Sequence, residues 1–170
     1  AVFRVDRDSG DVDWVVTSAP DDTPNLGDKL RLDIDDDPRD GPKRPHDARL
    51  DGDVLTMFDN RTDTGEPARA VAYRIDESAA TATLLWEIEQ QAGLTSVGLG
   101  STRVTPEGTV VISWGGAIQP VLGEYTTSGE PLIEITQVGG GNAYRITKEP
   151  SSAFSLDLLR ATAGGTIDMP

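Results

Sequence analysis

The stretch PHDARLDGDVLTMFDN, from Pro45 to Asn60, decides how the rest of the chain is interpreted. It contains His46, the only histidine of the chain, and passes through a short turn into VLTMFDN. This second part is rich in the β-branched, aromatic and other apolar residues that favour strands. We therefore expect a loop that leads into a strand, with His46 at the entrance.

Downstream of Asn60, short strands and turns alternate. RAVAYRID and TATLLWEI are predicted strands, and ESAA between them is a predicted turn. A second set follows in the same order, with the strands GSTRV, TVVISW, PVLGEY and PLIEITQV. Setting Arg49 against Arg103, and Phe58 against Trp114, shows that the two sets are similar in size, with small insertions. A repeat of four short strands is typical of a β-propeller blade.

Upstream of Pro45, the chain opens with AVFRVDRDSGDVDWVV, which predicts a hairpin. The DRDSGD segment supplies the side-chain hydrogen bonds and the glycine that a tight turn requires. The residues that follow are rich in Pro, Asp and Gly and predict a long loop, with LRLDI as a brief strand.

We expect an all-β fold: a partial β-propeller of about three blades, each a four-stranded antiparallel sheet. Closed propellers have about four to eight blades, so the remaining blades are expected from the same longer chain or from a second chain. The chain opens without an initiator Met, which also favours a piece of a longer product. The expected segments are 1–16, the end of one blade; 17–46, a rim loop; 47–88 and 99–138, two blades; and 141–170, the start of a further blade and a tail.

The composition narrows the classes of function. The net charge is −14, from 29 acidic and 15 basic residues, which opposes binding to nucleic acid or to an anionic membrane surface. Asp outnumbers Glu, and Lys occurs only at positions 29, 43 and 148. This composition is similar to that of proteins from salt-loving archaea, in which concentrated salt screens the self-repulsion; the alternative is an ordinary acidic surface.

Several kinds of site are not expected. The chain has no Cys, no apolar run long enough to span a membrane, no signal peptide and no phosphate-binding glycine loop. Asp33, Asp35 and Asp37 have the spacing that begins a calcium loop. However, Pro38 stands where that loop needs Gly, and Arg44 stands where it needs Glu. We therefore expect a solvated acidic loop, no metal site and no cofactor.

The order DDDPRDGP, HDARL, VLTMFDN, AYRID, TLLWEI and GSTRVTPEGTVVISWGG resembles the arylsulfotransferase family over most of residues 2–146. Members of that family are periplasmic or secreted six-bladed propellers that move a sulfo group between phenols. The resemblance implies a larger, six-bladed ring, an extracellular or cell-surface location, a phenolic sulfate donor and a phenol acceptor, without a nucleotide.

The resemblance also implies a site. In the family, a histidine at the head of the strand that ends in FDN is the nucleophile, and His46 occupies that place; neutral imidazole suits the role because it is a good nitrogen nucleophile. The alternative is that His46 is an ordinary surface residue. Donors aimed at the sulfo oxygens would stabilise the transferred group. The expected substrate-binding residues are Arg61 as first choice, with Asn60, Arg44, Ser101 and Thr102.

Some features depart from this pattern or compete with it. Many family members read FDNG, whereas Arg61 follows FDN here, and the family's other active-site histidines and arginine lie on blades before residue 1. Asn60-Arg61-Thr62 is also an N-glycosylation sequon, which conflicts with a substrate role for Asn60. Ser101 and Thr102 could instead satisfy the backbone where their strand starts. The rival function is a non-catalytic extracellular or filament-associated propeller that serves as a structural or interaction module.

Overall fold

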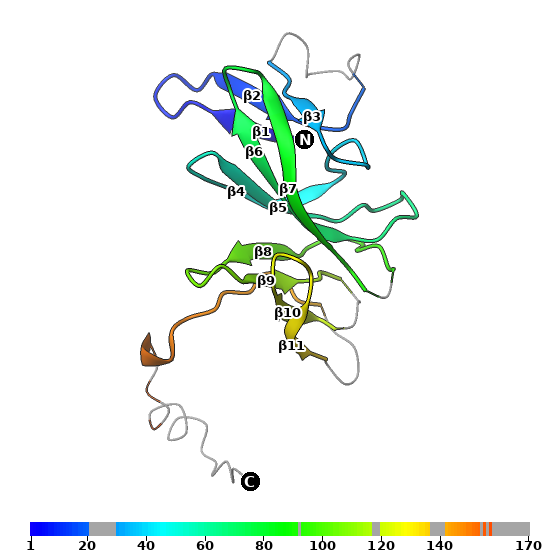
Figure 1. Cartoon of the computed structure of the whole chain (residues 1–170), viewed down its shortest axis with the longest axis vertical. Coiled ribbons are helices and arrows are strands. Elements are labelled where there is room, and N and C mark those ends of the chain that lie inside the picture. The colour runs from blue at the N-terminus through cyan, green and yellow to red at the C-terminus, as the bar shows by residue number, and fades with distance from the viewer. Residues whose placement is uncertain are drawn as a thin grey trace.

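The computed structural model describes residues 1–20, 30–91, 93–116, 120–136, 142–153, 155 and 157. These residues form three sheets, of two, five and four strands (Figure 1). The prediction of an all-β fold is confirmed. The strands are β1 (Val2–Val5), β2 (Val12–Val16), β3 (Asp33–Asp35), β4 (Pro45–Asp51), β5 (Val54–Asp59), β6 (Arg69–Asp76), β7 (Thr81–Glu89), β8 (Ser101–Val104), β9 (Val110–Ser113), β10 (Leu122–Tyr125) and β11 (Pro131–Ile135), followed by a single 3-10 turn, η1 (Ser151–Ala153).

β1 and β2 form the N-terminal hairpin that the sequence predicts. The carboxylate of Asp6 accepts hydrogen bonds from the backbone N–H groups of Asp8 at 3.0 Å and Ser9 at 2.7 Å, which closes the turn. Gly10 follows with a φ of 78°, a left-handed conformation that favours glycine. The local chemistry of DRDSGD therefore accounts for this element.

The five-stranded sheet has the strand order β3-β7-β6-β5-β4. β4 to β7 form an antiparallel meander, in which β5, β6 and β7 are the strands expected after His46. β3, the brief strand expected within LRLDI, pairs with β7 in parallel. The sheet is mixed and has five strands because the loop before β4 runs back along β7, so it differs from the expected four-stranded antiparallel sheet.

The four-stranded sheet has the order β11-β10-β9-β8 and is antiparallel throughout. Its strands are those predicted for the second set, GSTRV to PLIEITQV. Both large sheets therefore contain four consecutive strands that meander in chain order, which is the regularity that the sequence repeat indicates.

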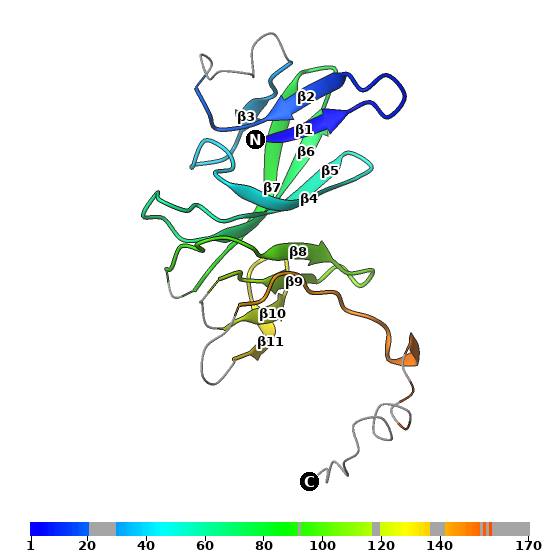
Figure 2. The ribbon, with the colours of Figure 1, turned by 180° about the vertical axis from the view of Figure 1, so that it is seen from behind.

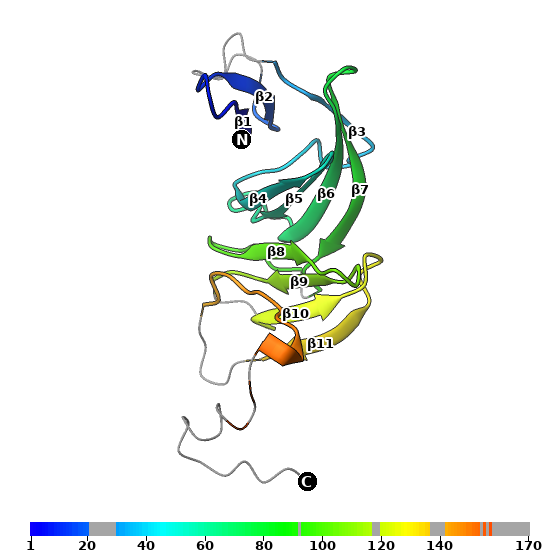
Figure 3. The same cartoon turned by 90° about the vertical axis from the view of Figure 1, so that its left-hand side faces the viewer.

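The three sheets lie one after another in a column (Figure 3). Between β4–β7 and β8–β11, the rings of Phe58 and Trp114 meet edge to face with their centroids 6.0 Å apart, and Tyr125 packs on Trp114 in the same way. Each contact between sheets is filled by its own apolar cluster, as layered β structures require. The first cluster contains Trp14, Val16, Leu32, Leu55, Met57, Val71, Tyr73, Ile75 and Ala82; the second contains Phe58, Ala68, Ala70, Ile88, Val110, Ile112, Trp114 and Tyr125.

Parts of the predicted organisation lie outside the described residues. These are residues 21–29 of the rim loop and most of the tail after residue 153. After residue 141, an isolated bridge joins Asn142 to Gly116. Within the described part of the chain, no helix is long and apolar enough to cross a membrane.

Candidate functional site

His46 lies inside β4, paired with Phe58 of β5, whereas the sequence places it at the end of a loop. The strand already begins at Pro45, opposite Asp59. Proline has no N–H to donate, but it is tolerated at the first position of an edge strand, and β4 is the edge of its sheet. The histidine is therefore held by strand pairing and not by a loop.

A β-bulge at Asp47 and Ala48 changes which side chains of β4 share a face. His46 pairs with Phe58 and Arg49 pairs with Thr56, so β4 has one residue more than β5 between these pairs. Asp47 has a φ of 55° at the bulge. Paired residues project to the same face, and Phe58 and Thr56 are two apart; His46 and Arg49 thus both project toward the four-stranded sheet. Figure 2 shows β4 lying next to β8 on this side.

His46 lines a pocket of about 350 Å³. Its imidazole is half-buried, and no hydrogen bond joins it to any part of the chain that the structure describes. Arg44 is exposed at the same pocket and pairs with Asp63 at 3.3 Å. A neutral imidazole beside an exposed guanidinium can act as a nucleophile next to a group that binds anions. The full lining is Ala1, Arg44, Pro45, His46, Asn60, Thr62, Val97 and Gly98.

Asn60 lines this pocket but is fully buried. Its Nδ2 donates to the backbone oxygens of Arg44 at 3.2 Å and Leu99 at 3.1 Å, and so ties the segment before β4 to the segment before β8. Its Oδ1 is buried and has no partner among the described residues. A glycan on this sequon would have to displace these contacts, so the folded chain offers it no access.

Arg61, the first choice for contact with the sulfo group, is fully buried and does not line the His46 pocket. The chain turns at this residue, where φ is 52°. It donates to Asp59 at 3.1 Å and also pairs with Glu66. In this fold its charge is neutralised by carboxylates of the chain itself.

Ser101 and Thr102 begin β8 and are also fully buried. The hydroxyl of Ser101 accepts a hydrogen bond from the backbone N–H of Ile146 at 3.1 Å, which is a structural role. The hydroxyl of Thr102 has no partner in the described structure. Thr102 lines a different pocket from His46, so the structure brings together Arg44, His46 and Asn60 but not the other predicted residues.

A buried ionic cluster that the sequence pattern does not predict is centred on Arg69, the first residue of β6. Arg69 binds both carboxylate oxygens of Asp37 at 2.9 Å, Asp59 at 3.1 Å and Glu87 at 2.8 Å. The hydroxyl of Tyr73 donates to Asp37 at 2.5 Å. The side chains of Arg69, Asp37 and Asp59 are fully buried, so each charge depends on its partners.

The pKa values of the cluster follow from these contacts. Burial alone would raise the pKa of Asp37, but hydrogen bonds from Arg69 and Tyr73 outweigh it and hold that pKa well below its ordinary value. For Asp59, burial is the stronger effect and raises the pKa against the attraction of Arg69. Burial opposes the charge of Arg69, yet its bonds to Asp37 and Glu87 raise its pKa, so it stays protonated.

The prediction of a solvated acidic loop is wrong for Asp37. The side chains of Asp33 and Asp35 are exposed as expected, although both lie on β3, but Asp37 is buried and organises the loop after it. Its two oxygens accept the backbone N–H groups of Arg39 and Gly41, both at 3.0 Å. The signal in the sequence was Arg69 at the start of an apolar strand, because a cation there needs a buried carboxylate.

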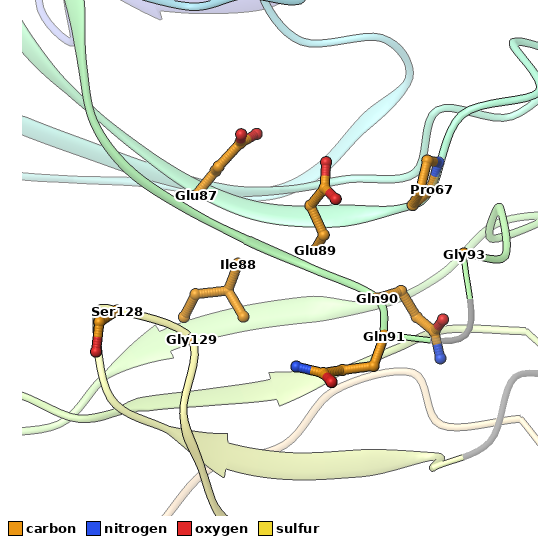
Figure 4. Close-up of a pocket in the computed structure, with 9 residues that line it drawn as sticks. All are labelled: Pro67, Glu87, Ile88, Glu89, Gln90, Gln91, Gly93, Ser128 and Gly129. Carbon is orange, nitrogen blue, oxygen red and sulfur yellow. The ribbon is translucent and has the colours of Figure 1, made fainter.

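A further pocket, of about 330 Å³, lies at the end of β7 beside the turn between β10 and β11 (Figure 4). Two of its carboxylates are already neutralised: Glu87 pairs with Arg69, and Glu89 pairs with Arg39. The remaining polar groups in Figure 4 are glutamines and a turn serine, which offer no nucleophile beside a base.

Among the described residues, no group of three or more His, Asp or Glu side chains could hold a metal ion. The His46 pocket is therefore the place where the chain combines a reactive side chain, a cation and an opening. Comparison with protein-family models and with curated proteins finds no match for the chain.

Proposed function

We propose that the chain is part of a β-propeller of the arylsulfotransferase type, in which His46 carries a sulfo group from a phenolic sulfate to a phenol. The observation that carries this proposal is the open pocket at His46. The imidazole there is half-buried and free of described hydrogen bonds, and Arg44 lies beside it. A ring nitrogen that makes no hydrogen bond and faces a pocket can attack a bound group. In a histidine with a structural role, both ring nitrogens normally form hydrogen bonds to neighbouring groups.

The architecture supports this proposal. Two consecutive four-stranded meanders stack face to face, as neighbouring blades do. The far face of β8–β11 carries Val111, Leu122, Ile133 and Ile135 around a shallow hollow, and the two isoleucines are about half exposed. A next sheet, from the same longer chain or from a second chain, would cover this face in the way that β8–β11 covers β5 and β6.

The proposed chemistry has two displacements at sulfur. A ring nitrogen of neutral His46 attacks the sulfur of the donor, an N–S bond forms, and the S–O bond to the leaving phenolate breaks. The acceptor phenol then attacks the same sulfur and loses its proton to solvent, while the N–S bond breaks and neutral imidazole returns. Arg44 would attract the negative sulfo oxygens in both steps.

The test is to trap the intermediate. The full chain is incubated in concentrated KCl with 4-nitrophenyl sulfate and no acceptor, and its intact mass is measured. We expect the mass to rise by one SO₃ group, release of nitrophenolate, and neither result for His46→Ala. Arg44→Gln should slow the release, whereas Arg74→Gln, an equally exposed change on β6, should leave it unchanged. A folded chain that neither gains mass nor releases nitrophenolate contradicts the proposal.

The second candidate is a non-catalytic propeller module that acts outside the cell or on its surface. The specific observation in its favour is that Arg61, Asn60 and Ser101 are all engaged in internal contacts. If this candidate is correct, His46→Ala should bind the partners of the module as the wild type does. The trapping experiment should then give no adduct.

A further inference from the structure

A second hollow lies along β4, on the same face as His46 but beyond the bulge. It has a volume of about 470 Å³ and separates the exposed part of β4 and β5 from β8. Its walls are apolar in part, with Val54 from β5 and Val104 from β8, and polar in part. The lining residues are Arg49, Asp51, Val54, Thr56, Thr102, Arg103 and Val104.

Three arginines converge on Asp47 at the edge of this hollow. Arg103 binds both oxygens of the Asp47 carboxylate. Arg49 and Arg145 come only to 3.7 Å and 3.6 Å from it, and both side chains are about half exposed. The Asp47 carboxylate thus engages one guanidinium fully, and the N–H groups of the other two remain open to solvent or to a ligand.

The charges at this place do not balance. Arg49 and Arg103 line the hollow against one carboxylate, Asp51, which leaves one positive charge. Beside the hollow, the charges of Arg145 and Asp47 offset each other. Burial and, secondarily, the nearby Arg145 lower the pKa of Arg103, as expected for cations that lack enough carboxylates. In a chain of net charge −14, such a positive site is unusual.

Thr102 supplies an independent observation. It lines the same hollow and is fully buried, and its hydroxyl has no hydrogen-bond partner in the described structure. A buried hydroxyl without a partner costs stability, and a valine of the same shape would avoid that cost. The hydroxyl oxygen is itself closed to solvent, so a ligand oxygen would satisfy it only by displacing the side chains that cover it.

We propose that this hollow binds a singly charged organic acid, with its oxyanion on Arg49 and Arg145 and its apolar body between Val54 and Val104. The single excess charge favours a monoanion, such as a sulfonate, a sulfate monoester or a carboxylate. The guanidinium fork matches the paired oxygens of all these groups. This site requires no reaction at His46 and is independent of the proposed function.

The test is a titration of the full chain with benzenesulfonate at constant ionic strength, followed by backbone amide chemical shifts. We expect saturable shifts in β4 and β8. Loss of a charged hydrogen bond weakens binding about tenfold or more, so Arg49→Gln should do so. Arg74→Gln, another exposed arginine of the same sheet, should change the affinity less than about twofold.

Two further variants separate ligand binding from structure. Thr102→Val should weaken binding while leaving the thermal midpoint unchanged or higher; a merely structural threonine would lower it. His46→Ala should bind normally, even if it abolishes sulfo transfer.

The choice of acid tests the chemistry of the ligand. If benzoate binds as tightly as benzenesulfonate, the site accepts any organic acid that combines a singly charged oxyanion with an apolar body. The proposal is overturned by any of three results: inorganic sulfate binds more tightly than both acids, Arg49→Gln and Arg74→Gln lose affinity equally, or benzenesulfonate causes no saturable shift.

Discussion

Replacing Arg69 by methionine should destabilise the chain severely. Methionine retains most of the aliphatic stem but removes the charge that Asp37, Asp59 and Glu87 share. Asp59 keeps its contacts with Arg61 and with the backbone N–H of Lys43, but Asp37 loses both hydrogen bonds from a cation. The variant therefore leaves a buried carboxylate without a countercharge.

The size of the effect follows from the burial. Breaking a buried ion pair by removing one partner costs about 3–5 kcal/mol, and Asp37 and Arg69 both have fully buried side chains. A domain is typically stable by only about 5–15 kcal/mol, so the variant should lose a large share of its free energy of unfolding. Arg74→Met on the same strand is the control. Its partner Asp53 is 3.7 Å away and both side chains are exposed, so the loss should be less than about 1 kcal/mol.

The difference between wild type and Arg69→Met should depend on pH. The pKa of Asp37 is lowered in the fold, so its contribution to stability is present above the ordinary Asp range and is lost as pH falls toward the folded-state pKa. In the variant that contribution disappears, because burial without Arg69 raises the pKa. Asp59 acts in the opposite direction: its pKa is raised, so stability is lost as pH increases from the ordinary Asp pKa to that raised value.

The assay is urea unfolding followed by circular dichroism at neutral pH and again below about pH 4, where an ordinary Asp is protonated. We expect a gap of about 3–5 kcal/mol at neutral pH that narrows in acid. If Arg69→Met is already unfolded without urea, refolding on acidification gives the same result. A loss no greater than that of Arg74→Met, with an unchanged m-value, refutes the reasoning.

Three other outcomes are expected from urea unfolding. Gly100→Ala places a Cβ in a clash with the Phe58 ring at a φ of 91°, so it should cost about 1–3 kcal/mol more than Gly108→Ala, where φ is also positive but the space is open. Equal losses would show that Phe58 moves away freely. Tyr125→Phe removes the acceptor of the Trp114 Nε1 bond and should cost about 1–3 kcal/mol with a change in near-UV circular dichroism; no change in either signal would contradict that bond. Added KCl should raise the urea midpoint of the wild type, because salt screens the net charge of −14; a falling midpoint would oppose the interpretation of the composition.

Much of the fold could be predicted because its signals are local. The turn at Asp6 to Gly10 needs only side chains within that turn, and the strands RAVAYRID and TATLLWEI are found where the apolar pattern predicts them. The parallel pairing of β3 with β7 could not be predicted in this way. The pairing joins residues far apart in sequence, and nothing in LRLDI indicates with which edge strand of the sheet this segment will pair.

The candidate site is harder to predict from sequence, because charged side chains usually lie on the surface and here some do not. Arg61 and Arg69 are fully buried. Arg61 pairs with the nearby Asp59, whereas Arg69 pairs with Asp37 from a distant part of the chain. The guanidinium fork can bind several carboxylates at once, which an ammonium cannot do. Part of the preference for Arg over Lys is therefore explained by the interior of the protein, whatever the salinity in which it works.

The bulge in β4 cannot be predicted from the regular alternation of side chains between the two faces of a strand. In a regular strand, His46 and Arg49 would project to opposite faces, and one hollow would lack its key residue. The residue inserted at Asp47 and Ala48 turns both toward β8, and Asp47 itself binds Arg103 of that strand. The bulge thus places two hollows in series along one edge, one with an imidazole and one with an excess of arginine. Because Asp47 joins the two sheets at this point, a change there should disturb both hollows together, whereas changes at His46 or Arg49 should affect one each.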